Sequence, residues 1–546
     1  MNSVRRVVIG VLASTMVASA AGGAERPAAE DPLDGIIQQG VAALVAMRTD
    51  DGSWRAHGKF KAGPTALAAW ALLECGVKAD DPGMAKTLDW LVKQDEQWTY
   101  TLALRCNALA RANRATRNKF AKQLAADATL LINSTSDGSY GYDSNGTPAS
   151  GDNSNAHYGM MGVEAAAESG VNVPPAYWNK VLKHWIFVQC EDGGWRYQGR
   201  AAAGTGTMTL GGIASLSTAA NLSGLYRANP GKKLEALVFG RKCLDAYIDP
   251  TSRDGYYLFN LSRAAMGGGR KFYDKVDWFR AAAATLAKTQ GRDGSWNGRF
   301  GDTVATSQAL LFLARCRRPV LMAKLEHEGD WDRQAGDVAG LTRWIAQGEH
   351  GHLVNWQTVR TSDPADNWID ARILYITGTQ DPKLDADSLE RIKAFIDGGG
   401  TVLSVAQTNG DAFSKAMRAA CAAMYPAAAL KAVPADDPLN GGASADAPKT
   451  QKLQAVLADG RTITISKKAE ARTPAASRLE TLRDKGRILI VHCSDDLAAS
   501  WATGSNTGPA ARAFALTMNI IAATVGKIES LPPRSSGLNA AGREEP

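Results

Sequence analysis

Cysteine is scarce in this chain of 546 residues, and no two cysteines form a CxxC pair. A zinc ribbon or a thioredoxin-like redox motif needs such close pairs, so the sequence favours neither. Most of the seven cysteines stand in or beside apolar stretches, where a thiol behaves as a small hydrophobic group. We therefore expect buried free thiols at Cys75, Cys106, Cys190, Cys243 and Cys316.

A strong charge of one sign is also missing. The formal net charge is +7, and it falls to +5 without residues 1–24, which hold Arg5, Arg6 and no acid. The remaining excess is spread along the chain, and basic residues form no stripe with interleaved aromatics. Because nucleic-acid binding needs such a stripe, we do not expect a nucleic-acid partner.

Long hydrophobic runs are absent after the N-terminus. Arg5 and Arg6 precede an apolar run at residues 7–18, and Ala18-Ser19-Ala20 offers small residues for cleavage, with Ala24 as a later position. This layout is typical of a signal peptide and is too short for a membrane span. We expect residues 1–24 to be removed and the mature chain to be exported, to the periplasm or outside the cell, and not to be transmembrane.

The chain does contain a repeated phrase, Asp-Gly followed by a small or aromatic residue and an aromatic one. It begins at Asp51, Asp137, Asp192, Asp254 and Asp293, and a degenerate copy begins at Asp95. The aromatic positions are separated by 44, 42, 55, 61 and 40 residues, which is the length of one supersecondary unit. The six aromatic residues are Trp54, Trp98, Tyr140, Trp195, Tyr256 and Trp296.

The flanking residues indicate what each repeat contains. Amphipathic stretches such as 36–45 and 278–286 precede the phrase, and nearly all-apolar stretches such as 66–73 and 304–313 follow it. A helix that is apolar all round must be buried, whereas one with a polar face can meet water. Each repeat is therefore predicted to be an outer helix, a turn and an inner helix. Six repeats over residues 33–320 would close twelve helices into two concentric rings.

The Asp-Gly-Ser-Trp turns followed by small-residue inner helices resemble the repeats of the squalene cyclase and protein prenyltransferase superfamily, which fold as (α/α)6 toroids. Family members that protonate alkenes use an Asp-x-Asp-Asp cluster, which this chain lacks. Prenyltransferases hold a catalytic zinc through three ligands. Cys316 and His327 lack the local sequence of that site, so we expect no catalytic residue, metal or cofactor in the ring.

In the second half of the chain, the spacing of apolar residues changes from helical to strand-like. We expect a charged connector at 321–351, an α/β domain at 352–527 and a disordered tail at 528–546. Strand-like runs at 373–378, 401–405, 463–465 and 487–492 alternate with helical runs at 387–396 and 510–525, which favours a parallel sheet. The Ala-, Asp-, Gly- and Pro-rich stretch 434–454 is predicted to be a loop.

This half resembles a domain of unknown function attached to secreted bacterial toroid proteins, itself similar to class I glutamine amidotransferases, so a flavodoxin-like fold is implied. The residues that carry the resemblance include 355–358, 374–378, 396–400, 434–439 and 494–497. An amidotransferase needs a nucleophilic Cys on the turn after a strand, but residues 406–410 contain none. His492 and Cys493 are neighbours on a strand and must point to opposite faces. Asp495 and Asp496 are interpreted as helix caps.

Two places are candidate ligand sites. The inner helices of a toroid begin at one rim, where their positive ends favour anionic or hydroxyl-rich ligands. In an open α/β sheet, ligands bind beyond the carboxyl ends of the strands. The candidate residues at the rim are Asp152, Asn153, Asn155, His157, Tyr158, Arg196, Tyr197, Tyr257 and Asp302. Those of the α/β crevice are Thr377, Thr408, Asn409, His492 and Asp495.

Two functional hypotheses follow. The first is an exported non-catalytic scaffold whose cavities bind an unidentified ligand or a protein partner of the cell envelope. The second is an enzyme acting in the toroid cavity, either a degenerate terpenoid-type cyclase or a glycan hydrolase or lyase. A glycosidase needs two carboxylates about 5–9.5 Å apart, and Asp152 and Asp302 are the matched candidates.

Overall fold

The computed structural model describes residues 31–144, 151–228, 234–348, 351–434, 437–441, 450–456, 462–468, 478–504 and 509–538. The expected signal peptide lies outside these residues. Within them, every helix is too short or too polar to cross a lipid bilayer.

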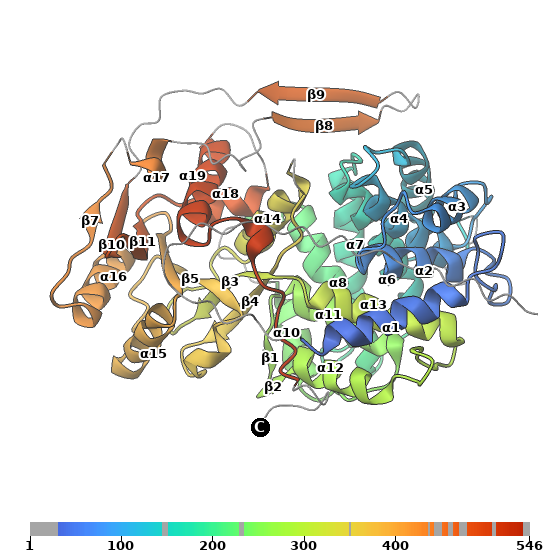
Figure 1. The fold of residues 1–546 in the computed structure, drawn as a ribbon, viewed down its shortest axis with the longest axis horizontal. Helices are drawn as coiled ribbons and strands as arrows, with labels where there is room; N and C mark the ends of the chain where they lie inside the picture. The colour runs from blue at the N-terminus through green and yellow to red at the C-terminus, as the bar shows by residue number, and fades with distance from the viewer. Residues whose placement is uncertain are drawn as a thin grey trace, which may run out of the picture.

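The N-terminal part is a ring of helices (Figure 1). Each of six inner helices contacts the next, and the last contacts the first, which closes the ring. In the described residues the inner helices are α2 (Gly63–Glu74), α4 (Thr99–Asn113), α6 (Asn153–Glu168), α8 (Gly206–Leu222), α11 (Gly255–Gly267) and α13 (Asp302–Cys316). The outer helices are α1 (Leu33–Ala46), α3 (Pro82–Leu91), α5 (Ala121–Asn133), α7 (Pro175–Phe187), α10 (Glu235–Leu244) and α12 (Trp278–Thr289). The region thus resembles an α/α toroid, as predicted.

The contrast between apolar and amphipathic helices explains the two layers. In α2 every residue from Gly63 to Leu73 is buried. In α1 only Leu33, Gly40, Ala43 and Leu44 are buried. A helix surrounded by neighbours has no face left for water, whereas an outer helix keeps one polar face.

The Asp-Gly turns fasten each outer helix to its inner partner. The indole Nε1 of Trp195 donates to the carbonyl of Trp185 at 2.7 Å, and its backbone N–H donates to Thr209 Oγ1 of α8 at 3.1 Å. Gly193 has φ +89°, a conformation that favours glycine. The same pair of bonds recurs at Trp54, with Leu44 and Thr65, and at Trp296, with Leu286 and Thr306.

Three copies of the phrase depart from this pattern, and in the first of them the Tyr140 hydroxyl lies 2.8 Å from the Tyr177 hydroxyl of α7. Asp254 caps α11 by accepting from the N–H of Tyr256 at 2.9 Å, so this copy starts an inner helix. Trp98 is likewise the N-terminal cap residue of α4. The ring also contains a short helix, α9 (Leu225–Ala228), and a two-stranded hairpin, β1 (Phe272–Tyr273) and β2 (Val276–Asp277).

The C-terminal part is built on a seven-stranded sheet in the order β4-β3-β5-β6-β11-β10-β7. The first five strands are parallel, and β10 and β7 are antiparallel additions at one edge. The expectation of a wholly parallel sheet is therefore wrong at this edge. The strands are β3 (Val320–Glu326), β4 (Asn355–Arg360), β5 (Ala371–Gly378), β6 (Thr401–Ala406), β7 (Lys431–Ala432), β10 (Leu479–Asp484) and β11 (Arg487–Cys493).

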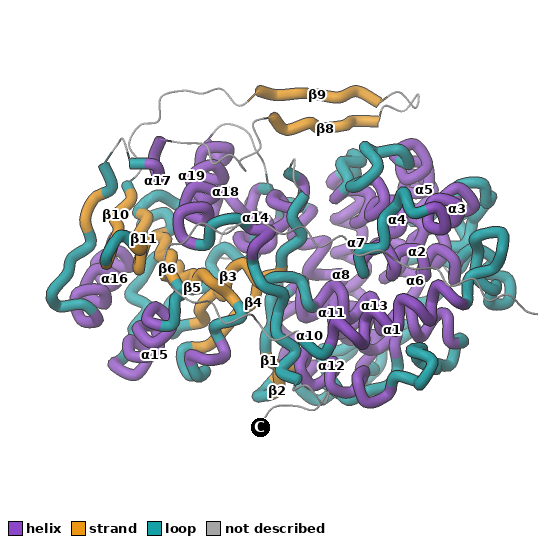
Figure 2. The backbone as a smooth tube through the Cα atoms, viewed as in Figure 1, coloured by secondary structure: helices purple, strands orange, loops and turns teal. Residues whose placement is uncertain are grey.

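Helices cover both faces of the sheet (Figure 2). Along β5, Ile373 and Tyr375 pack into one hydrophobic cluster and Leu374 and Ile376 into the other. The first cluster holds α14 (Asp337–Gln347), α18 (Leu497–Thr503) and α19 (Pro509–Thr524); the second holds α15 (Ala386–Asp397) and α16 (Asp411–Met424). The remaining elements are η2 (Ala365–Asn367), α17 (Pro438–Gly441), η3 (Ile528–Ser530) and a hairpin of β8 (Thr450–Val456) and β9 (Thr462–Lys468).

Three boundaries need correction. The segment 321–351 is not a connector, because β3 lies inside the sheet and α14 covers it. Residues 528–538 are ordered against the ring, where Arg534 pairs with Asp277; residues 539–546 lie outside the described part. The stretch 434–454, predicted to be a loop, includes α17 and the first residues of β8.

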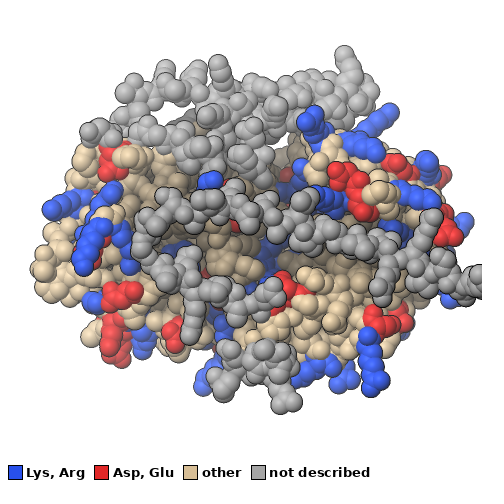
Figure 3. Space-filling model, viewed as in Figure 1, with Lys and Arg blue, Asp and Glu red and all other residues tan. Residues whose placement is uncertain are grey.

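The two parts contact each other directly. Asn355 Nδ2 donates to the Arg315 carbonyl at 3.0 Å, and Arg114 Nη1 donates to the Ala346 carbonyl at 2.8 Å. On the face shown in Figure 3, acidic and basic side chains are intermixed over both parts. All seven cysteines are free thiols, and five of them are buried; Cys75 and Cys243 are half-buried.

Candidate functional site

Tyrosines of three inner helices meet where these helices begin. Tyr158 of α6 lies 4.4 Å from Tyr100 of α4 and 5.9 Å from Tyr256 of α11, between ring centroids. Burial raises the pKa of Tyr100 and of Tyr256 well above the ordinary value of 10.0. We call this end of the ring, where Tyr100, Tyr158 and Tyr256 meet, the mouth.

Two further tyrosines at the mouth are accessible to solvent. Tyr142 is 36% exposed and Tyr197 is 40% exposed. Tyr142 Oη lies 3.5 Å from Asp152 Oδ2. Burial, followed by the charges of Asp254 and Asp152, raises the pKa of Tyr197. Tyr142 thus places a phenol beside the carboxylate of Asp152, which caps α6.

Of the predicted residues at the start of α6, Asp152 caps the helix, whereas His157 and Tyr158 are buried. Asp152 caps the helix by accepting from Ser154 N at 2.8 Å, and Asn155 Nδ2 donates to the same carboxylate at 3.2 Å. His157 is fully buried, with Nδ1 3.0 Å from Ser215 Oγ of α8, and burial lowers its pKa well below 6.5. Tyr158 is 5% exposed and fills the centre of the mouth. The deeper end of the mouth is thus packed with side chains.

Other predicted residues do not meet there. Asn153 donates to the Arg196 carbonyl at 2.8 Å and faces His184 of the outer helix α7 at 2.9 Å. Tyr257 donates to the Tyr247 carbonyl at 2.7 Å, so its hydroxyl is engaged away from the mouth. The side chains of Arg196 and Asp302 are exposed. Asp152 and Asp302 are not joined by any hydrogen bond in the described residues, and Asp254 caps α11 through Tyr256 N.

The opposite end of the ring is charged and covered. Glu74 of α2 pairs with Arg318 at 2.5 Å and with Arg111 of α4 at 3.4 Å. Burial opposes the charge of Glu74, but the arginines lower its pKa from 4.5 to about 2. Helix C-termini carry partial negative charge, which cations offset. The hydrogen bond from Arg114 to Ala346 places the end of α14 against this end of the ring.

The predicted crevice of the α/β unit is partly closed. Thr377 is buried and donates to the Val405 carbonyl at 2.8 Å. The loop after β3 covers the end of β5, because Asp330 accepts from Thr379 N at 2.9 Å. Thr408 N donates to Asp496 Oδ2 at 2.8 Å, which joins the loops after β6 and β11; the neighbouring Asn409 is exposed, with φ +68°.

His492 is a structural residue in this unit. It is fully buried, its Nδ1 lies 3.0 Å from Ser404 Oγ, and burial lowers its pKa to about 4. Its ring stacks on Phe413 while Cys493 packs in the cluster on the other face, as predicted. Asp495 pairs with Arg478 at 3.0 Å, and Asp496 caps α18 through Ala499 N.

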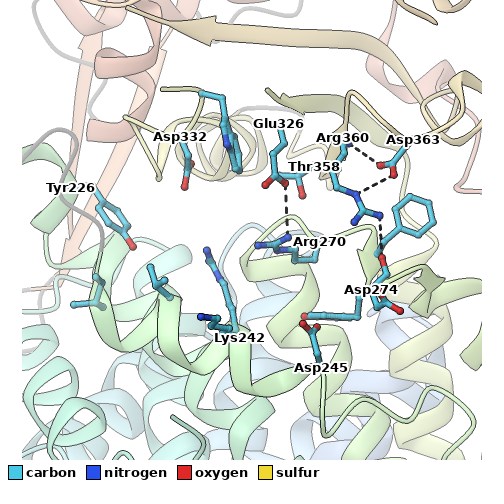
Figure 4. A pocket seen from close by; sticks show the side chains of 16 residues that line it. Tyr226, Lys242, Asp245, Arg270, Asp274, Glu326, Asp332, Thr358, Arg360 and Asp363 are labelled. Atoms are coloured by element: carbon cyan, nitrogen blue, oxygen red, sulfur yellow. Dashed lines mark hydrogen bonds and ion pairs between the residues drawn. The ribbon is translucent and has the colours of Figure 1, made fainter. Parts of the chain in front are cut away.

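A pocket of about 470 Å³ lies between the ring and the α/β unit (Figure 4). Lys242, Asp245 and Arg270 reach it from the ring, and Glu326, Asp332 and Arg360 face them from the carboxyl ends of β3 and β4 and the following loop. Its other lining residues are Tyr226, Leu234, Val238, Arg241, Phe272, Tyr273, Asp274, Trp331, Thr358 and Asp363. Within the described residues, no three Cys, His, Asp or Glu side chains are placed to hold a metal ion.

The sequence prediction missed the central residues of both places. Tyr100, Tyr142 and Asp254 at the mouth were not selected, although Asp254 begins one of the repeated phrases. No short sequence motif marks the pocket, because its lining residues come from two separate stretches of the chain, 226–274 and 326–363. The pocket lies at the carboxyl ends of β3 and β4, whereas the predicted crevice lies at those of β5, β6 and β11, at the same edge of the sheet.

An inactive variant of the α-1,6-mannanase GH76A of Salegentibacter, in complex with α-1,6-mannotriose, matches with 12% identity and a TM-score of 0.39. The match covers 52% of this chain and 98% of that one, and it concerns the fold alone. No curated protein matches significantly. Residues 321–522 match the model of a family described as a domain of unknown function, DUF4159.

Proposed function

We propose that this protein is exported and binds a hydroxyl-rich ligand, a segment of a glycan, at the mouth of the ring. The observation that carries the proposal is the group of tyrosines at the mouth, where Tyr142 and Tyr197 are accessible and Tyr142 Oη lies 3.5 Å from Asp152 Oδ2. Aromatic side chains with a few well-placed polar groups are the usual lining of a ligand site. A sugar ring offers an apolar face to a phenol ring and hydroxyls to carboxylates.

The ligand is placed at the mouth because the opposite end of the ring is covered by the α/β unit. There α14 and the residues after it contact Arg114, and buried Glu74–arginine pairs occupy the helix ends. At the mouth, Tyr142 and Tyr197 remain accessible. An extended ligand that stacks on these two phenols would lie over the packed rings of Tyr100 and Tyr158.

A second candidate function is hydrolysis of the bound glycan. Asp152 caps α6 and Asp254 caps α11, and Tyr158 and Tyr256 of these two helices lie 5.9 Å apart, so Asp152 and Asp254 are a second carboxylate pair to test beside Asp152 and Asp302. A paired acid and base, or acid and nucleophile, is what glycoside hydrolysis requires. The terpenoid-cyclase-like and amidotransferase-like alternatives gain no comparable pair, because residues 406–410 hold Thr408 and Asn409 where a nucleophile would stand.

The test is binding to a panel of neutral and acidic oligosaccharides, with α-1,6-mannotriose as one probe, measured by calorimetry. Replacing Tyr197 by Ala should weaken binding about tenfold, since it removes one stacking surface without touching a helix cap. Phe187→Ala is the matched control, because Phe187 is 74% exposed on the outer helix α7. Failure of every glycan to bind, or equal affinity of the Tyr197 variant and the parent, would refute the proposal.

The hydrolysis candidate is tested separately. Asp254→Asn should keep binding within about threefold but abolish release of reducing ends if the carboxylate is catalytic. If the parent binds a glycan without cleaving it, the protein is a binder only. Export is tested by sequencing the N-terminus of the secreted chain, which should begin after residue 20 or 24.

A further inference from the structure

The pocket between the ring and the α/β unit has an inner end where two arginines come together. A smaller cavity of about 20 Å³ adjoins the 470 Å³ pocket and shares Arg241, Arg270, Trp331, Asp332 and Thr358 with it. Arg241 belongs to α10 and Arg270 precedes β1, so both guanidinium groups come from the ring. The facing side chains come from the α/β unit.

The positive charge at the inner end is incompletely neutralised. Arg270 Nη1 lies 4.0 Å from Glu326 Oε2, the outer limit of an ion pair. Arg241 makes no ion pair with any described residue. Asp332, the acid that lines the smaller cavity, lies 3.3 Å from the ammonium group of Lys324, which also pairs with Asp337 at 2.8 Å. Two guanidinium groups thus share the smaller cavity with one carboxylate.

The remaining acids of the pocket are engaged or peripheral. Asp363 Oδ1 lies 3.1 Å from Arg360 Nε, and the same carboxylate accepts from the Arg360 backbone N–H at 2.8 Å. Asp245 and Asp274 are exposed on the ring side of the pocket. Neither lines the smaller cavity.

Flat apolar groups stand beside the arginines. Tyr226 is 9% exposed and Trp331 is half-buried, and both line the pocket. Glycines keep the space open: a Cβ at Gly268 would lie 3.3 Å from Arg241 Nη2, and a Cβ at Gly269 would lie 2.3 Å from the ring of Trp356. The glycine run at 267–269 thus lets the ring backbone approach without side chains that would fill the cavity.

We propose that this pocket binds a small anionic ligand, with its carboxylate or phosphate held by Arg241 and Arg270 and its flat face against Trp331 and Tyr226. Guanidinium groups offer paired donors that fit either anion. The site is separate from the glycan site at the mouth. Because residues of both parts line it, a bound anion would also hold the ring and the α/β unit together.

The experiment measures binding to the full exported chain by calorimetry at low salt, with benzoate, phenyl phosphate and inorganic phosphate as probes. Benzyl alcohol is the uncharged match for benzoate. We expect benzoate or phenyl phosphate to bind at least about tenfold more tightly than benzyl alcohol, and Arg241→Gln to weaken that binding about tenfold or more. The two aromatic probes distinguish a carboxylate from a phosphate ligand, and inorganic phosphate measures the contribution of the flat face.

Two control variants separate recognition from folding. Arg253→Gln removes an exposed arginine elsewhere on the ring and should leave the dissociation constant within about twofold. Arg241→Lys keeps the positive charge but loses the paired donors of the guanidinium group. It should therefore bind phosphate more tightly than Arg241→Gln and less tightly than the parent. The proposal is overturned if no probe anion binds, if benzyl alcohol binds as well as benzoate, or if folded Arg241→Gln protein binds anions as tightly as the parent. Loss of glycan binding at the mouth would leave this result unaffected.

Discussion

Arg534 Nη2 lies 3.2 Å from Asp277 Oδ1, which fastens the C-terminal segment to the start of the outer helix α12. The Asp277 carboxylate also lies 3.3 Å from Lys271 Nζ, and Arg534 Nε lies 3.6 Å from Asp370 of the α/β unit. Burial opposes the charge on Asp277, but Arg534 and Lys271 hold its pKa below 3.8. One ionic cluster therefore joins the ring, the sheet and the last described segment.

The first prediction concerns this cluster. Arg534 is 6% exposed, and Arg534→Met leaves two buried carboxylates with one fewer counter-charge. Removing one member of a buried pair costs about 3 kcal/mol of the free energy of unfolding. Urea denaturation followed by tryptophan fluorescence measures this loss. A change below about 0.5 kcal/mol would mean that Lys271 and Arg280 suffice.

The second prediction concerns a buried pair within the ring. Arg105 of α4 and Asp127 of α5 form a two-pronged ion pair, with atoms 2.7 and 2.8 Å apart, and are at most 2% exposed. Arg105→Met should cost about 3–5 kcal/mol, because it leaves the Asp127 charge buried alone. The double variant with Asp127→Leu should be more stable than the single one. Lys119→Met, at an exposed pair with Asp89, should change stability by less than about 1 kcal/mol.

The third prediction concerns the turn at Gly193. Its φ of +89° disfavours any side chain, and a Cβ there would lie 2.8 Å from Phe239 Cγ and 2.9 Å from the Phe239 carbonyl oxygen. Gly193→Ala should therefore lower the free energy of unfolding by about 2 kcal/mol. Gly35→Ala, in α1 with nothing within 4 Å of the added methyl, should instead raise it by up to about 1 kcal/mol. Equal effects at the two positions would contradict the role assigned to the turn.

The sequence predicted the ring because its signals are local. Trp54 and Trp195 each bond to the helix ten residues earlier, so every repeat carries its own turn residues and periodicity. Tyr256 and Tyr257 are one step apart on α11, which turns a side chain by about 100°, so the helix alone does not tell which of them faces the mouth. Only the packing of Tyr158 decides which of the two faces the mouth.

The missed strand and pocket depend on distant partners. The segment 320–326 contains Lys324, which argues against a buried strand until Asp337 is placed 2.8 Å from its ammonium group. The covered crevice likewise depends on Asp330 reaching Thr379, 49 residues later. A charged residue whose partner lies on another element reads as a surface residue in the sequence, so such segments were interpreted as connectors.

The last prediction concerns acid sensitivity and His492. Burial lowers its pKa from 6.5 to about 4, so between these values the unfolded chain takes up a proton that the folded chain does not. Stability must then fall as the pH drops from 6.5 toward 4, by up to about 3 kcal/mol from this residue. His492→Gln should make that part of the stability profile less steep, measured by urea denaturation at intervals between pH 4 and 7, while buried His157 continues to contribute. The same substitution at His57, whose side chain is exposed, should preserve the parental slope. An unchanged slope in the His492 variant would show that this imidazole does not contribute to the acid sensitivity of the fold.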